Sequence, residues 1–305
     1  MCAMGLPTFF IVGSPKCGTT ALAQLIAAHP DVFLSKPKEP HFFDAQYDKG
    51  LQAYMREHFS GWGGGGAAGE ATPSYLAVPY VPARIRNLIP AARLIAILRH
   101  PVQRSYSSWW MFHARGMEPL AFESAIRENE VGLRHSDLTG SAADEDAWRA
   151  HVEAVRRGQP IRVRNYLETG YYSHHIRRYF EHFPREQLKV VLSQDLQRDP
   201  ETTVRDIWRY LGVADDVPFA ESRAKNEAVG SGARPLLAIA RATGVMRLRR
   251  LMPESLRTRV KTRLSTLGKP PPLDPAMRAY LLDHYAPHNR DLEQLLGVEL
   301  TAWKR

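Results

Sequence analysis

Short, continuous apolar runs alternate with amphipathic stretches along the chain. The apolar runs at 8–12, 93–98 and 188–192 predict buried strands. The spacing of apolar residues elsewhere is typical of helices, which we expect at 19–29, 102–114, 172–183, 200–211, 275–285 and 287–296. Because strands that alternate with helices favour parallel pairing, the pattern predicts an α/β fold with a central, mainly parallel sheet flanked by helices.

Three stretches interrupt this alternation. Residues 61–69 are rich in glycine and are expected to form a mobile surface loop. Residues 136–146 are small and acidic, which fits either a loop or the start of a helix. The third stretch is basic and has helical spacing before it breaks at Gly268. Since no repeat or linker separates these parts, we expect one domain over 1–305, with a basic helical insertion at about 232–270.

The composition is that of a globular protein, with 305 residues of which 44% are hydrophobic and 24% charged. Two cysteines, Cys2 and Cys17, are too few for a disulfide framework or a four-ligand zinc site. No apolar run approaches the roughly 20 residues that span a bilayer, and the first residues lack the basic leader and long apolar core of a signal peptide. We therefore expect a cytoplasmic enzyme or binding protein.

The net charge of +9 is concentrated in one segment. Residues 241–269 hold nine basic side chains and a single acid, Glu254, so this segment alone carries +8. Such a segment attracts anions. It could be a solvated helix surface, a cover over a phosphorylated cofactor, a site for an acidic acceptor, or a peripheral contact with an anionic membrane. We expect no nucleic-acid partner, because no nucleic-acid-binding motif accompanies the charge.

A strand-to-helix turn carries the most specific chemistry, and its sequence is Gly13-Ser14-Pro15-Lys16-Cys17-Gly18-Thr19-Thr20. Glycines let the backbone approach a ligand closely. A helix start offers unpaired N–H groups and the positive end of the helix dipole. Lys16 adds a full charge, and two threonines add hydroxyl donors. The combination predicts a P-loop-like phosphate site in preference to an ordinary capped turn.

The turn differs from the Walker A pattern of nucleoside-triphosphate enzymes. Its lysine lies three residues after Gly13 and before Gly18, where Walker A places the lysine after the second glycine. No acidic strand end suited to magnesium is evident, so we expect no metal. A small-molecule kinase is therefore the less favoured alternative.

At this point the chain resembles the sulfotransferases that use 3′-phosphoadenosine 5′-phosphosulfate (PAPS). It is most similar to the glycosaminoglycan (heparan sulfate) branch and its bacterial relatives. The resemblance continues through Lys38-Glu39-Pro40-His41-Phe42-Phe43-Asp44, Gly69-Glu70-Ala71-Thr72-Pro73-Ser74-Tyr75 and Leu98-Arg99-His100-Pro101. It implies in-line transfer of the sulfuryl group from PAPS to a hydroxyl, or an amine, of a carbohydrate or glycolipid. It also implies adenosine 3′,5′-bisphosphate as product and no metal requirement. A lipid or phenolic natural product is the alternative acceptor.

The resemblance assigns the donor site. It implies that the turn 13–20 wraps the 5′-phosphosulfate and that Arg99 and Ser107 hold the 3′-phosphate. From the residues alone, Arg99 ends a strand and Ser107 follows eight residues later in a helix, and the carboxyl ends of parallel strands are where such sheets bind nucleotides. Tyr172 either lines the site or packs in the core. Lys269 is the candidate for a late basic loop that closes over the nucleotide.

Sulfuryl transfer to a hydroxyl requires a base beside the acceptor and a cation beside the leaving phosphate. Lys16 is the natural cation. The resemblance makes Glu39 the general base, and His41 is its rival because histidine titrates near neutral pH. We expect Glu70 and Lys38 to contact the acceptor. Glu70 is alternatively a partner for Lys16. Several glycosaminoglycan enzymes carry lysine where this chain has Ala71. Either the acceptor is not a glycosaminoglycan, or another basic residue such as Lys36 or Lys38 supplies the charge.

Overall fold

The computed structural model describes residues 5–134, 144–219 and 270–304. Within these ranges the strands form one five-stranded sheet in the order β2-β3-β1-β4-β5, and every neighbouring pair is parallel. The strands are β1 (Phe9–Ile11), β2 (Val32–Leu34), β3 (Ala67–Ala71), β4 (Arg93–Leu98) and β5 (Leu188–Leu192). The predicted α/β fold with a central parallel sheet is thus confirmed.

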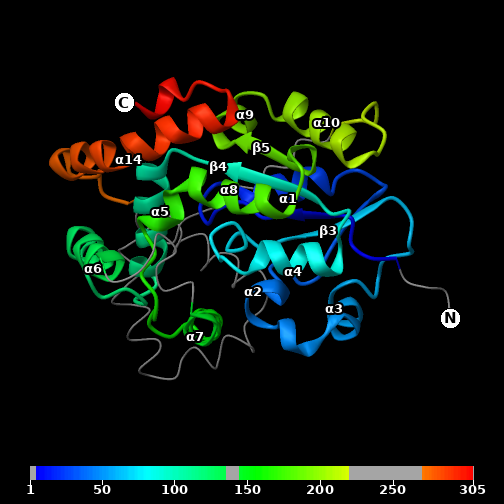
Figure 1. Cartoon of the computed structure of the whole chain (residues 1–305), viewed down its shortest axis with the longest axis horizontal. Coiled ribbons are helices and arrows are strands. Elements are labelled where there is room, and N and C mark those ends of the chain that lie inside the picture. The colour runs from blue at the N-terminus through cyan, green and yellow to red at the C-terminus, as the bar shows by residue number, and fades with distance from the viewer. Residues whose placement is uncertain (1–4, 135–143, 220–269, 305) are drawn as a thin grey trace, which may run out of the picture.

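Helices connect the strands and surround the sheet (Figure 1). They are α1 (Thr19–Ile26), α2 (Phe42–Ala45), α3 (Leu51–His58), α4 (Val81–Leu88), α5 (Pro101–Ala114), α6 (Phe122–Arg134), α7 (Glu145–Arg156), α8 (Tyr172–His182), α9 (Ser193–Arg198), α10 (Pro200–Leu211) and α14 (Pro275–Leu296). In the view of Figure 1, α9, α10 and α14 lie along one side of the strands, and α2, α3 and α7 lie along the other. Helix α14 packs on α5 and α8, and α2 packs on α7.

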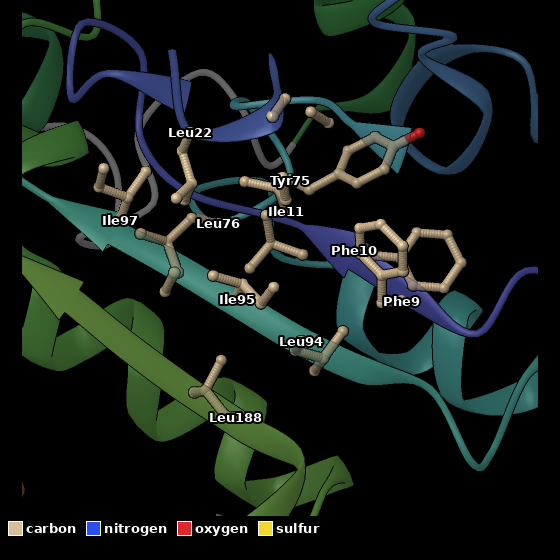
Figure 2. Packing of buried hydrophobic residues seen from close by; sticks show 14 of the residues in the cluster. Phe9, Phe10, Ile11, Leu22, Tyr75, Leu76, Leu94, Ile95, Ile97 and Leu188 are labelled. Carbon is tan, nitrogen blue, oxygen red and sulfur yellow. The ribbon is translucent and has the colours of Figure 1, made fainter. Parts of the chain in front are cut away.

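The central strand β1 is apolar along its whole length, and β4 is apolar after its first residue, because helices cover both faces of the sheet. Phe9, Phe10 and Ile11 of β1 have no exposed surface. Figure 2 shows side chains of β1 and β4, among them Ile11 and Ile95, in one cluster. Burying each such side chain contributes roughly 1.5–3 kcal/mol. The central pair β1 and β4 therefore forms a rigid base for the loops at its carboxyl edge.

Two strands were not predicted from the sequence, and one of them corrects the expected loop at 61–69. Residues 67–69 belong to β3, are buried, and pair with β1 and β2. A Cβ on Gly69 would lie 2.3 Å from the main-chain oxygen of Phe9. Glycine is thus needed at this position for close approach of two strands, and the expectation of a mobile loop is wrong there.

The helices at the carboxyl end also differ from the prediction. Two helices were expected on either side of Ala286, but α14 continues through Pro287. A proline inside a helix removes one backbone hydrogen bond. Buried side chains hold the helix on both sides of it, since Tyr285 donates to the main-chain oxygens of Tyr166 and Leu167 and Leu292 is fully buried. Tertiary packing therefore outweighs the local cost.

Helices α6 and α7 were not among the predicted elements. Helix α7 begins at Glu145 and is capped by the Asp144 side chain, which accepts from the N–H of Ala147. This agrees with a helix start near the end of 136–146. The predicted basic insertion at about 232–270 lies outside the described residues. In the described part of the chain, no helix is long and apolar enough to cross a membrane.

Candidate active site

The turn between β1 and α1 has the backbone of an anion-binding loop. A Cβ on Gly13 would lie 2.6 Å from Thr19 Cγ2 and 3.0 Å from Ile97 Cγ2, so any other residue would force these side chains to shift. Gly18 precedes α1 with a φ of 102°, which favours glycine. Helix α1 has no side-chain cap. The N–H groups of its first turn are therefore available to an anion, together with the helix dipole.

Lys16 lies at the tip of this turn with a φ of 72°. The side chain is half-buried and lines a cavity of about 480 Å³. Burial lowers the pKa of Lys16, and the positive charges of Arg115 and Arg99 lower it further, whereas the Glu39 carboxylate acts in the opposite direction. Three positive charges thus meet around the turn, an arrangement that a bound anion would stabilise.

Tyr172 holds the turn from the core and does not line the cavity. Its side chain is 1% exposed, and its hydroxyl donates to the main-chain oxygen of Arg99 at 2.8 Å. The same hydroxyl lies 3.6 Å from Cys17 Sγ. Ser14 Oγ adds a second link by donating to the main-chain oxygen of Thr169 at 3.4 Å. These contacts fix the shape of the turn.

A second wall of the cavity comes from the segment between β2 and α2, where Lys38, Glu39 and His41 border the same space as Lys16. Glu39 and His41 both have positive φ, at 60° and 57°. Such strained backbone is retained where the surrounding structure demands it, and it gathers at functional sites. The Glu39 carboxylate accepts a hydrogen bond from Lys38 Nζ, and 42% of its side chain is exposed. Glu39 is therefore accessible from the cavity.

His41 is held by a buried carboxylate. Its Nδ1 donates to Asp44 Oδ2 at 2.9 Å, and Asp44 also accepts from Ser74 Oγ at 2.6 Å and from Trp148 Nε1 at 3.1 Å. Burial acts to lower the pKa of His41, but the charge and the hydrogen bond of Asp44 outweigh it, so the pKa lies above its usual value. The protonated imidazole is thus favoured beside Glu39.

The third wall was not predicted from the sequence. It is built by α5 and α7, whose cavity-lining residues are Met111, Phe112, Arg115, Trp148, His151, Val152, Val155 and Arg156. No local motif marks these residues, because their role depends on the docking of α7 against α2. Their aliphatic and aromatic side chains give the cavity an apolar surface, with Arg115 and Arg156 adding positive charge.

Several predicted site residues lie away from the cavity. Glu70 is fully buried in β3, where it accepts hydrogen bonds from Tyr54 at 2.6 Å, Thr72 at 2.5 Å and Tyr75 at 3.1 Å. Burial raises the pKa of Glu70 to about 7. Glu70 therefore neither faces an acceptor in this cavity nor pairs with Lys16.

The remaining donor-site candidates divide between the two sides of the turn. Pro15, Lys16, Gly18, Thr19 and Thr20 line the cavity, whereas Gly13, Ser14 and Cys17 are buried behind the turn. Arg99 and Ser107 are half-buried and lie outside the lining of this cavity; Arg99 contacts the turn through the Lys16 main chain. Lys269 lies outside the described residues. In the described ranges, no cluster of three or more His, Cys, Asp or Glu could hold a metal ion.

The chain is similar to known proteins in both sequence and fold. The sulfotransferase domain model matches residues 6–223. The chain is 28% identical to the bifunctional heparan sulfate N-deacetylase/N-sulfotransferase 4 of Mus musculus, over 98% of this chain and 31% of that protein. It is 30% identical to the heparan sulfate glucosamine 3-O-sulfotransferase 3B1 of Homo sapiens, over 68% of this chain and 46% of that protein.

A solved structure extends the likeness to the whole fold. The sulfotransferase from Alicyclobacillus acidocaldarius superposes with a TM-score of 0.69 and 26% identity, over 99% of this chain and all of that one. The chain spans less than half the length of the two curated relatives. The family match nonetheless covers the sheet, the phosphate-type turn and the segment with Glu39. The predicted resemblance is confirmed, and the chain belongs to the sulfotransferase domain family.

Proposed function

We propose that this chain transfers a sulfuryl group from PAPS to a hydroxyl, or an amine, of a carbohydrate or glycolipid acceptor. One observation carries the proposal: a single cavity of about 480 Å³ is bordered by both Lys16 of the anion-binding turn and the carboxylate residue Glu39. Family membership supports the group transferred. The heparan sulfate acceptors named for the relatives support a carbohydrate.

The residues of the turn fit the phosphosulfate end of such a donor. Gly13 leaves no room for a side chain, α1 is uncapped, and Lys16 adds an ammonium group. Bound there, the donor would supply an electrophilic sulfur atom and a phosphate leaving group. Lys16 would then stabilise the negative charge that develops on the leaving oxygen. Arg99, adjacent through its hydrogen bond to the Lys16 main chain, is the proposed partner of the 3′-phosphate together with Ser107.

Glu39 is the proposed general base. A base must be unprotonated and able to reach the acceptor hydroxyl, and Glu39 is partly exposed to the cavity. Its pairing with Lys38 restrains the carboxylate. His41 suits this role less well, because Asp44 favours its protonated form. We assign His41 to hydrogen-bond donation toward the reacting groups.

A lipid or phenolic acceptor is the second candidate. The apolar wall of the cavity supports this candidate. The apolar residues that border the cavity there are Met111, Phe112, Val152 and Val155. An acceptor that combines hydroxyl groups with an apolar surface would meet both kinds of wall.

The proposal is tested by transfer of ³⁵S from labelled PAPS with the purified chain. The acceptor panel contains a desulfated heparan oligosaccharide, an alkyl glucoside and a simple phenol. We expect labelled saccharide and tight binding of adenosine 3′,5′-bisphosphate by calorimetry. Labelled phenol alone would favour the second candidate. No binding of the bisphosphate and no labelled product would overturn the proposal.

A further inference from the structure

His151 of α7 has a hydrogen-bonding pattern that determines where its proton lies. The side chain is 6% exposed and borders the cavity. Its Nδ1 accepts hydrogen bonds from the main-chain N–H groups of Arg162 at 3.3 Å and Val163 at 3.1 Å. A ring nitrogen that accepts carries no proton, so the neutral imidazole of His151 has its proton on Nε2.

The ring of His151 lies beside two aromatic side chains. Its centroid lies 5.2 Å from that of Trp148 and 6.4 Å from that of Phe112. Trp148 is itself fixed by its hydrogen bond to Asp44. Burial lowers the pKa of His151 to about 4, and the positive charge of His41 acts in the same direction while Asp44 opposes it. The ring therefore stays neutral near pH 7.

Among the described residues, both hydrogen bonds of the His151 ring go to Nδ1. His151 lines the cavity, and no hydrogen bond from its Nε2–H to a described residue is present, so this group can serve a ligand in the cavity. A ligand oxygen at this position would gain a hydrogen bond from Nε2–H. The flanking Phe112 and Val152 border the same cavity and are apolar.

We propose that His151 binds the acceptor by donating its Nε2 proton to an oxygen atom of a sugar, while Phe112 and Val152 contact the apolar C–H face of the same ring. This assignment rests on the proposed function and defines the acceptor side of the cavity. An uncharged donor beside apolar side chains suits a pyranose ring, which carries hydroxyl oxygens at its rim and C–H groups on its faces.

Two substitutions separate this role from a structural one. The amide oxygen of Asn in His151→Asn takes the place of Nδ1 and retains the anchor to residues 162 and 163, but the donor is lost. The amide nitrogen of Gln in His151→Gln takes the place of Nε2 and retains the donor, but the anchor is lost. We expect KM for the saccharide to rise roughly three- to tenfold in His151→Asn, the range for one neutral hydrogen bond, with unchanged binding of adenosine 3′,5′-bisphosphate.

The Gln variant should keep KM closer to the wild-type value while losing thermal stability. His182→Asn, at the end of α8 and outside the cavity lining, is the matched control and should leave KM unchanged. A purely structural His151 would give the reverse result, with a wild-type KM in His151→Asn. That outcome would overturn the assignment.

A readout that does not depend on turnover tests the assignment separately from the proposed function. ¹⁵N-histidine NMR should show His151 as the Nε2–H tautomer at pH 7, and addition of hexyl β-glucoside should shift this resonance while leaving that of His182 unchanged. A proton on Nδ1, or a His151 resonance insensitive to the glucoside, would contradict the assignment. A shift in a protein without transfer activity would support the binding role and contradict the proposed function.

Discussion

Arg99, the first residue after β4, donates from Nη1 to the main-chain oxygen of Lys16 at 3.2 Å. The contact joins two segments that are 83 residues apart in the chain. Tyr172 donates to the main-chain oxygen of Arg99 in turn. The position of the Lys16 ammonium group thus depends on a neighbouring strand and on a helix behind it, and disturbing any of the three should weaken anion binding.

Lys16→Ala should weaken binding of adenosine 3′,5′-bisphosphate by about 10- to 100-fold, because hydrogen bonds to charged groups contribute about 1.5–3 kcal/mol. Titration calorimetry at fixed salt measures this directly. Lys49→Ala removes an exposed lysine whose partner is Glu57 and is the matched control. Equal affinities of the wild type and Lys16→Ala would remove the basis for the donor site.

Glu39→Gln should lower kcat by about 10²- to 10⁴-fold, the usual contribution of a general base. The bisphosphate affinity should change little, because the amide preserves the size of the side chain at this positive-φ position. Steady-state transfer of labelled sulfate measures kcat. Glu57→Gln is the control, since Glu57 lies on α3 outside the cavity lining. Full turnover in Glu39→Gln would shift the base assignment to His41.

Gly13→Ala should destabilise the fold and abolish bisphosphate binding together. The new Cβ would lie 2.6 Å from Thr19 Cγ2, and overpacking of this kind typically costs about 1–3 kcal/mol. Urea unfolding measures the change in the free energy of unfolding. Gly132→Ala in α6 meets open space and should instead gain up to about 1 kcal/mol from helix propensity. A neutral Gly13→Ala would show that the turn adapts to a side chain.

Glu70 should make the protein less stable as pH rises. Burial raises its pKa in the folded state from 4.5 to about 7, so the folded state binds the proton more tightly than the unfolded state. The contribution is complete below pH 4.5 and is lost as pH rises through about 7, a total of about 3 kcal/mol. Urea unfolding at a series of pH values measures this loss.

Glu70→Gln should flatten this pH dependence, because the amide cannot ionise. Burial raises the pKa of Glu168 to about 7 as well. Glu168→Gln should therefore remove a similar part of the pH dependence of stability. If the wild type and Glu70→Gln lose stability in parallel between pH 5 and 8, the buried carboxylate is not the cause.

Local pattern was sufficient for the strands that consist mainly of a continuous apolar run. The strands β4 and β5 have the predicted bounds, because apolar residues fill β4 after Arg93 and all of β5 except Lys189. β3 was missed because its sequence, Ala-Ala-Gly-Glu-Ala, is small and includes a carboxylate. Its strand character comes from close pairing with β1, which the single chain segment does not reveal.

Some residues of the candidate site could likewise be predicted from the sequence, and others could not. The turn 13–20 was predicted from its glycines, lysine and threonines, which suit a phosphate-type ligand, whereas the segment with Glu39 was singled out only through its resemblance to the sulfotransferase family. The sequence did not show whether the Glu70 side chain faces the cavity or the core. In the structure Glu70 is fully buried. The tertiary structure placed it among Tyr54, Thr72 and Tyr75.

Sequence alone therefore determined the fold class, which depends on short-range patterns of burial, and the family, which follows from the order of its motifs. The turn 13–20 was predicted as an anion site from its glycines and lysine. Only the tertiary structure decided which side chains share the cavity with Lys16. The wall with His151 exists because α7 docks beside α2 through the hydrogen bond of Trp148 to Asp44. Contacts between residues 104 positions apart follow from packing of the whole chain and leave no local signature.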